Sequence, residues 1–163
     1  MLSSIDYNHL SLFQGLTASQ NLLVKPIFQS VYEPAGNILF NQGDLADYLY
    51  LVLDGEVIIR YKPEDGPAII VSRVRAEGIV GWSSALGSPS YTSSAVCTTD
   101  CQMLRVRGED LRALCENYPE TGALILERLA VVIAERLRNT YDHVITLLEQ
   151  GLRLNEDKAN ATK

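Results

Sequence analysis

The spacing of apolar residues divides the 163-residue chain into distinct parts. Within residues 1–28, apolar positions recur every three or four residues, which is the period of an amphipathic helix. From 29 to 107, short runs of β-branched and aromatic residues alternate with Gly, Pro, Asn and Asp, as in strands joined by tight turns. From 108 to 150 the helical period returns, and residues 151–163 are polar. The pattern therefore predicts short N-terminal helices, a β body, C-terminal helices and a flexible tail.

The predicted strands are short and closely spaced, which is typical of a small antiparallel barrel or jelly roll. They are Ile38–Phe40, Tyr48–Leu53, Glu56–Tyr61, Ala68–Val74, Ser94–Cys97 and Gln102–Val106. Asp54-Gly55 lies between two of them and predicts a hairpin, because a tight primed turn needs residues that accept positive φ. We therefore expect a mainly β fold with flanking helices: an antiparallel β-roll or jelly roll with N-terminal helices and a long C-terminal helix.

The long C-terminal helix carries an apolar stripe whose members are separated by steps of four and three over about three heptads, the spacing of a coiled-coil seam. The stripe includes Ile133, Leu137, Val144 and Leu147. Glu135, Arg136 and Arg138 fall off the stripe, so we expect them to face water. A small roll cannot cover the whole length of such a helix. Part of the stripe is therefore predicted to meet another chain, in a homodimer or in a larger protein complex.

Composition and charge narrow the class of protein. A net charge of −6 and an isoelectric point near 4.9 argue against nucleic acid as a partner, because phosphate binding needs a clustered basic face. The N-terminus has no basic stretch followed by an apolar run, so it is unlike a signal peptide, and no apolar run reaches the roughly 18 residues of a membrane span. Three cysteines in such a chain favour reduced thiols and a cytoplasmic protein.

Several motifs occur in a fixed order along residues 10–145. They are Leu12-Phe13-x-x-Leu16, a glycine-punctuated stretch from Gly36 to Val57, Gly78-x-x-x-Gly81, Asp100-Cys101-x-x-Leu104, and Asp110-Leu111 followed by Pro119. In this order they resemble the cyclic-nucleotide-binding domain family, in particular the sensor half of catabolite-activator-type bacterial regulators. The resemblance implies a nucleotide pocket in the roll and pairing of the long helix with its two-fold mate.

The segment after Val80 resembles the phosphate-binding cassette of that family. The candidate pocket residues are Gly81, Trp82, Ser83, Ser84, Tyr91, Thr92 and Ser93. The resemblance places Trp82 where the family has the glutamate that holds the ribose, and Tyr91 where it has the arginine that neutralises the phosphate. A phenol offers one neutral donor in place of a charged, bidentate group. Losing one charge-assisted hydrogen bond of about 1.5–3 kcal/mol lowers affinity roughly ten- to over a hundredfold. Binding of cyclic AMP is therefore doubtful.

Three alternatives remain for this pocket. Trp82 and Tyr91 fill it by packing, which is the more common role of aromatic side chains, or they stack on a different planar ligand. In a third arrangement Arg73 or Arg75 reaches in and replaces the missing arginine. The first alternative predicts a regulatory or structural module that acts through protein–protein contacts. The second predicts a sensor of a cyclic nucleotide or of another anionic or planar ligand.

Other chemistry finds little support in the sequence. Cys97 and Cys101 lack the spacing of a metal knuckle and have no nearby histidine, so we expect core thiols and no metal. Some relatives bind haem, and His9 is a conceivable ligand, although a surface or capping histidine is the simpler interpretation. No nucleophile–base motif or phosphate-binding loop is present, so neither a cofactor nor an enzymatic activity is predicted. After Gln150 only thirteen residues remain, too few for the helix-turn-helix of the related regulators, so we expect no DNA binding.

Overall fold

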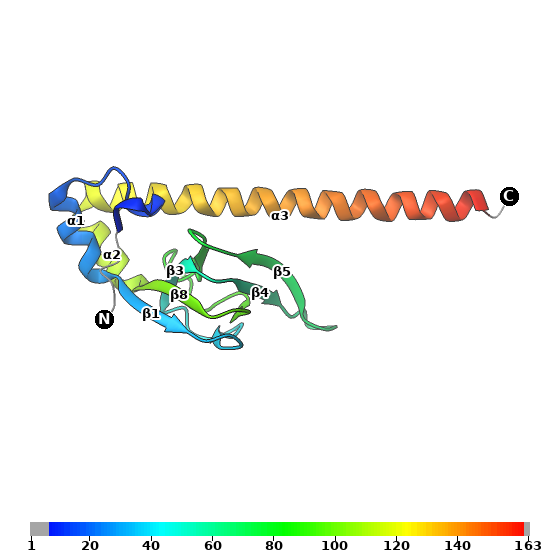
Figure 1. The fold of residues 1–163 in the computed structure, drawn as a ribbon, viewed down its shortest axis with the longest axis horizontal. Coiled ribbons are helices and arrows are strands. Elements are labelled where there is room, and N and C mark those ends of the chain that lie inside the picture. The colour runs from blue at the N-terminus through cyan, green and yellow to red at the C-terminus, as the bar shows by residue number, and fades with distance from the viewer. Residues whose placement is uncertain (1–6, 162–163) are drawn as a thin grey trace.

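Two four-stranded antiparallel sheets form a β-roll, and helices cover one side of it (Figure 1). The computed structural model describes residues 7–161. The first sheet has the strand order β1-β8-β3-β6, and the second has the order β2-β7-β4-β5. The strands are β1 (Gln29–Glu33), β2 (Ile38–Phe40), β3 (Tyr48–Asp54), β4 (Val57–Tyr61), β5 (Ile69–Val74), β6 (Ile79–Val80), β7 (Ser94–Cys97) and β8 (Cys101–Arg107). This architecture confirms the predicted fold class.

Two of the eight strands, β1 and β6, were not predicted from the sequence. β1 has the sequence Gln-Ser-Val-Tyr-Glu, whose polar residues hide its strand character, and it becomes a strand by pairing along its whole length with β8. β6 is only two residues long and pairs with β3. Both strands exist because of a neighbour far away in the sequence, so local patterning carries no signal for them.

The prediction of a hairpin at Asp54-Gly55 was wrong. β3 belongs to the first sheet and β4 to the second, so this turn carries the chain from one sheet to the other. Gly55 has φ +98°, and a Cβ there would clash with the carbonyl oxygen of Asp100 and lie 2.7 Å from the Cys101 sulfur. A sharp crossing between sheets therefore needs the same residue types as a hairpin turn. The hairpin that does form joins β4 and β5.

β3, an inner strand of the first sheet, is buried on both faces. Leu49 and Leu51 of β3 belong to a core that also contains helical residues, whereas Tyr50 and Val52 belong to a core shared with the second sheet. The alternation follows from the strand period of two, and it explains why β3 is continuously apolar.

Helices begin and end the described chain. Three short 3₁₀ helices, η1 (Tyr7–His9), η2 (Ser11–Phe13) and η3 (Lys25–Ile27), surround α1 (Ala18–Val24), which opens with a capping box between Thr17 and Gln20. α2 (Gly108–Asn117) follows the roll, and α3 (Pro119–Ala161) begins at the predicted proline. The first six residues of the predicted N-terminal region lie outside the described part.

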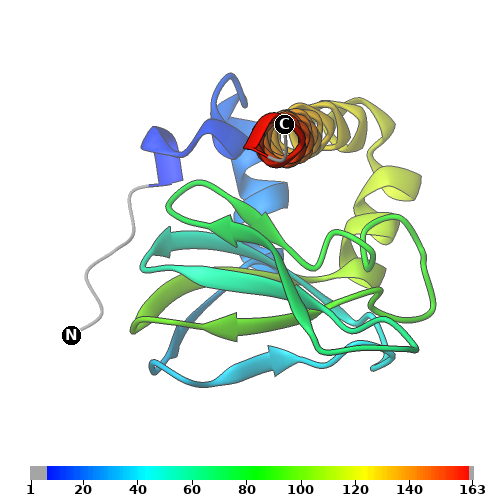
Figure 2. The ribbon, with the colours of Figure 1, turned by 90° about the vertical axis from the view of Figure 1, so that its right-hand side faces the viewer.

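α3 is the longest element and ends later than predicted. It continues through Ala161, where the sequence analysis expected a flexible tail from residue 151. Apart from Gly151, this stretch contains no Gly or Pro and is rich in Leu, Arg, Glu, Lys and Ala, which favour helix. Seen end-on in Figure 2, α3 lies across the top of the roll, with the N-terminal helices on one side and α2 on the other. No helix within residues 7–161 combines the length and apolar character of a membrane span.

Candidate functional site

The cassette segment connects β6 to β7 and begins with a glycine that no other residue can replace without strain. Gly81 has φ +77°, and a Cβ there would lie 2.7 Å from the carbonyl oxygen of Tyr48 and 3.2 Å from the rings of Phe40 and Tyr91. The chain then makes consecutive turns, in which the Ser84 N–H donates to the Gly81 carbonyl at 3.1 Å. The glycine thus lets the cassette pass close to β2 and β3.

Tyr91 is packed into the roll at the position where the family resemblance places an arginine. Its side chain is 5% exposed, and its ring stacks on Phe40 with 3.6 Å between centroids and 11° between planes. Its hydroxyl donates to the Tyr48 carbonyl at 2.6 Å and accepts from the Tyr48 N–H at 2.9 Å. Burial raises the pKa of this phenol to about 12. Ring and hydroxyl are therefore both engaged by β2 and β3.

A small cavity of about 60 Å³ lies beside Tyr91. It is lined by six of the seven predicted pocket residues and by three others: Gly81, Trp82, Ser83, Tyr91, Thr92 and Ser93, with Phe40, Ile59 and Arg136. The seventh, Ser84, is fully buried away from this cavity, where its hydroxyl donates to the Gly81 carbonyl at 2.9 Å. Arg112 of α2 donates to the Ser84 carbonyl at 2.8 Å, so this serine ties the cassette to the helix.

A larger cavity of about 330 Å³ lies between the roll and α3. Its walls come from β4, β5, the cassette and the helix: Ile59, Tyr61, Val71, Ser72, Trp82, Thr92, Ser93, Ile133, Arg136 and Leu137. Trp82 lines both cavities, is half-buried, and packs against the helical core. The indole thus forms a wall of the space under α3 and leaves a cavity of ligand size beside it.

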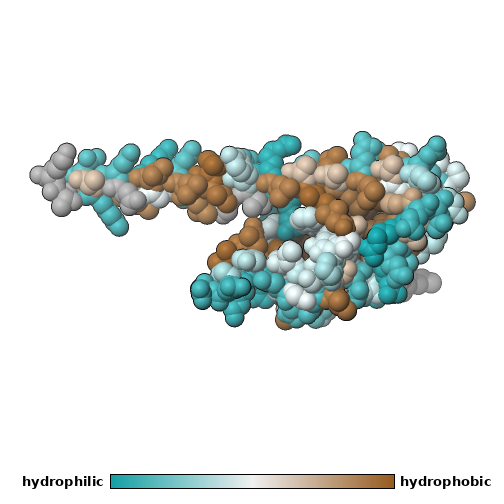
Figure 3. All heavy atoms as spheres, turned by 180° about the vertical axis from the view of Figure 1, so that it is seen from behind, coloured by the Kyte–Doolittle hydropathy of each residue, from teal (hydrophilic) through white to brown (hydrophobic). Residues whose placement is uncertain are grey.

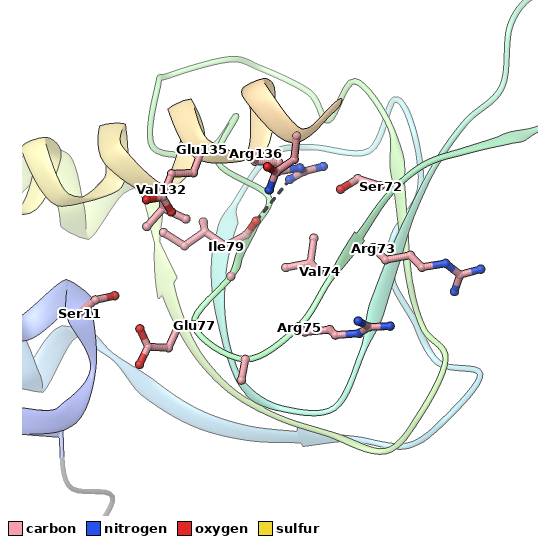
Figure 4. Close-up of a pocket in the computed structure, with 13 residues that line it drawn as sticks. Ser11, Ser72, Arg73, Val74, Arg75, Glu77, Ile79, Val132, Glu135 and Arg136 are labelled. Carbon is pink, nitrogen blue, oxygen red and sulfur yellow. Dashed lines mark hydrogen bonds between the residues drawn. The ribbon is translucent and has the colours of Figure 1, made fainter. Parts of the chain in front are cut away.

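Arg136 is a member of the site that the sequence analysis missed. We expected it to face water, but it is half-buried against the roll, and its guanidinium donates to the Ile79 carbonyl at 3.3 Å (Figure 4). Burial lowers the pKa of this guanidinium. It also lines both cavities. The apolar stripe does not predict the burial of Arg136, because this contact depends on where the roll meets the polar edge of α3.

Arg73 and Arg75 are held outside the cassette. Both form ion pairs with Glu56, at 2.9 Å each, and both point away from Arg136 in Figure 4. The hydrogen bond from Arg75, together with those from Thr98 and Arg73, lowers the pKa of the Glu56 carboxyl. Neither arginine lines the small cavity at the cassette, so the structure gives no support to the alternative in which one of them replaces the missing phosphate ligand.

The predicted stripe on α3 is exposed in the single chain. Leu137 is 58% exposed, Val144 47% and Leu147 53%, while Ile133 is half-buried over the larger cavity. Figure 3 shows apolar side chains gathered along the part of the helix that projects past the roll. Exposed apolar patches of this kind mark interaction surfaces in soluble proteins.

The three cysteines are free thiols, and two of them belong to the core between the sheets. Burial raises the pKa of Cys97 to about 12, so this thiol stays protonated at neutral pH. Over residues 7–161, no group of His, Cys, Asp and Glu side chains is arranged to hold a metal ion. His9 lies exposed in η1, and no such group forms around it.

Two curated transcriptional regulators or receptor proteins are similar to most of this chain. The cyclic AMP receptor protein of Thermus thermophilus is 32% identical over 127 residues, which are 78% of this chain and 57% of that protein. The CRP-like cAMP-activated global transcriptional regulator of Mycobacterium tuberculosis is 28% identical over 137 residues, 84% of this chain and 59% of that protein. The chain therefore spans less than two thirds of the length of either relative.

Solved structures share the fold. A putative cyclic nucleotide-binding protein from Geobacter metallireducens has a TM-score of 0.72 at 28% identity, covering 84% of this chain and 99% of that one. A cyclic nucleotide-binding domain from Methylobacillus flagellatus has a TM-score of 0.75 at 25% identity, covering 85% and 78%. The model of the cyclic nucleotide-binding domain matches residues 31–118, more than half of the sequence. The chain therefore belongs to the cyclic nucleotide-binding domain family.

Proposed function

We propose that this protein is a cytoplasmic, non-enzymatic regulatory or structural module that has lost cyclic AMP binding and acts through protein–protein contacts of α3. The proposed loss of cyclic AMP binding is carried by one observation, the packing and hydrogen bonding of Tyr91. This side chain stands at the family's arginine position, yet its ring is stacked on Phe40 and its hydroxyl is hydrogen-bonded in both directions to Tyr48.

The phenol of Tyr91 is a poor ligand for a cyclic phosphate. A cyclic phosphate at the cassette needs a cation, and the hydroxyl of Tyr91 is neutral because its pKa is near 12. Turning the phenol towards a ligand breaks two hydrogen bonds, each with a net contribution of about 0.5–1.5 kcal/mol, and also the ring stack. The cassette segment itself therefore carries no cation for a phosphate, and the guanidinium that lines its small cavity, that of Arg136, comes from α3. Tyr91 also resists the movement that would offer even a neutral donor.

The proposed protein–protein contact is supported by the exposed apolar stripe of α3. Leu137, Val144 and Leu147 recur at coiled-coil spacing and stay exposed in the single chain. A two-fold pair buries such a stripe on both copies at once, and two-fold dimers are the commonest symmetric assemblies. A homodimer through α3 is therefore the simplest protein–protein contact for this molecule.

Titration calorimetry with cyclic AMP tests the loss of binding. We expect no heat of binding at sub-millimolar nucleotide, and no thermal stabilisation, whereas a ligand at 100 times its Kd adds about 2.7 kcal/mol. The double change Trp82→Glu with Tyr91→Arg restores the family residues and is expected to create measurable affinity. A low-micromolar Kd for the unaltered protein contradicts the proposal.

A second candidate function is favoured by the larger cavity. It has a volume of about 330 Å³ and brings the indole of Trp82, the hydroxyls of Thr92 and Ser93, and the guanidinium of Arg136 to one space. This combination suits a planar ligand with an anionic group, as in a sensor. A thermal-shift panel of cyclic mono- and dinucleotides discriminates the two functions. A stabilising ligand whose effect disappears in Arg136→Gln supports the sensor, and an unresponsive protein supports the first proposal.

A further inference from the structure

A third cavity, of about 300 Å³, lies between α3 and the stretch of chain that runs from β5 to β6 (Figure 4). It shares Ser72 and Arg136 with the larger cavity of the site, but its described lining includes no residue of the cassette. Its volume is in the range of pockets that hold small molecules, which fix their ligands by a few convergent polar groups. The groups around this cavity therefore indicate which ligand it can hold.

One wall of this cavity is formed by backbone. Every residue from Ser72 to Ile79 lines it. Successive side chains of a strand point to opposite faces of a sheet, so a cavity that touches each residue in turn runs along the edge of the strand. β5 is the last strand of the second sheet, and over residues 7–161 no strand pairs with its outer edge. This edge therefore presents backbone N–H and C=O groups to the cavity. Arg73 and Arg75 line it in this way, while Glu56 holds their side chains.

The two ends of the cavity carry opposite charges. Figure 4 shows Glu77 and Glu135 at the end near Ser11, and Arg136 at the other end, towards Ser72. Glu135 and Arg136 are neighbours in the sequence, and their side chains diverge by about 100° around the axis of α3, which separates the two charges. A guanidinium has five N–H donors in a planar fork, so Arg136 can serve the Ile79 carbonyl and a carboxylate together.

The backbone conformation of Glu77 also draws attention to this end of the cavity. Glu77 has φ +65°, a region that glycine enters freely and that residues with a Cβ rarely adopt. Strained backbone of this kind is concentrated at functional sites. A carboxylate that is held there despite the strain supports a role for this side chain at the cavity.

We propose that this cavity binds a small zwitterion, an amino acid or a short peptide. Its ammonium group lies at Glu77 and Glu135, its carboxylate lies at Arg136 and Ser72, and its carbon skeleton faces Val132. Each charge of such a ligand meets an opposite charge, whereas a nucleotide or another polyanion would meet the two carboxylates of the cavity. The edge of β5 offers further hydrogen bonds to the peptide groups of a longer ligand. This site is independent of the proposed pairing of α3 and of the loss of cyclic AMP binding.

A thermal-shift panel with the intact chain tests the proposal. The probes are the standard amino acids and the dipeptides alanylalanine and leucylglycine, each at millimolar concentration. We expect at least one probe to raise the melting temperature, and calorimetry then gives its Kd. The N-acetyl and amide derivatives of that probe each lack one of its charges, so each is expected to bind about tenfold more weakly or worse. A panel without a stabilising probe overturns the proposal, and so does a probe whose derivatives bind as tightly as the zwitterion.

Two charge-removing variants locate the site. Glu77→Gln and Glu135→Gln each take away a carboxylate at the ammonium end, and each is expected to raise the Kd of the probe about tenfold or more. Both side chains are exposed, so the circular dichroism spectrum is expected to stay unchanged. Glu127→Gln, at an exposed glutamate of α3 outside the cavity, is the matched control and leaves the Kd unchanged. A probe that binds both cavity variants as tightly as the wild type occupies another place, and this result overturns the proposal.

Discussion

Tyr91 offers the sharpest test of the cassette. In Tyr91→Phe the ring keeps its stack on Phe40, but the two hydrogen bonds to the Tyr48 backbone disappear. Their loss leaves a part-buried N–H and carbonyl without this partner, so we expect the free energy of unfolding to fall by about 1–3 kcal/mol. Tyr91→Ala also removes a ring that is 5% exposed, and we expect a loss of about 3–5 kcal/mol.

Urea unfolding followed by tryptophan fluorescence measures both changes, because Trp82 is the only tryptophan and lines the same small cavity. Tyr118→Phe is the matched control: its side chain is 48% exposed, and we expect a change within about 0.5 kcal/mol. If Tyr91→Phe is as stable as the control, the hydroxyl does not seal the cassette. Such a result would refute the proposal that Tyr91 is unavailable to a ligand.

Three further outcomes are expected. Trp82→Ala should lower the free energy of unfolding by about 2 kcal/mol, less than for a fully buried ring because the indole is half-buried; a loss below about 1 kcal/mol would favour the sensor. Hydrogen bonds from Arg75, Thr98 and Arg73 lower the pKa of Glu56 from its ordinary 4.5, so its contribution to stability is present above that pH and is lost as pH falls through the lowered pKa. Glu56→Gln should therefore flatten the acid limb of a stability–pH curve, and an unchanged limb would count against this role. Leu137→Glu should dissociate the helix pair in sedimentation experiments without lowering the strand signal in circular dichroism, whereas an unchanged mass would argue against pairing at this residue.

Local chemistry was enough to predict most of the roll. β-branched and aromatic runs such as those of β3 and β4 become strands wherever they are paired, and the long helix follows from its apolar period. Connectivity was harder to predict. Asp54-Gly55 satisfies the backbone of a hairpin turn and equally that of a crossing between sheets, and only the pairing of β3 with β8 decides between them. Long-range pairing of this kind is invisible to a turn rule.

In the candidate site, too, the residues within one segment could be predicted from the sequence, whereas the residue brought in by a tertiary contact could not. Gly81, Trp82 and Tyr91 were identified because they fall in one continuous segment whose order resembles the family cassette. Arg136 was missed because α3 brings it to the cassette from more than forty residues away in the sequence. Its place on the polar edge of the helix predicted that the side chain of Arg136 would be exposed to solvent. Its burial depends instead on the distance between α3 and β6, which the spacing of apolar residues does not encode.

Ile133 and Leu137 belong at once to the apolar stripe of α3 and to the wall of the 330 Å³ cavity. Whatever enters the cavity and whatever pairs with α3 therefore touch the same two side chains. The two equilibria are thermodynamically linked: a compound that binds the paired form more tightly must strengthen pairing by the same factor, and one that prefers the separated chain must weaken it. A compound found by screening for the cavity would thus reveal itself as a change in subunit affinity.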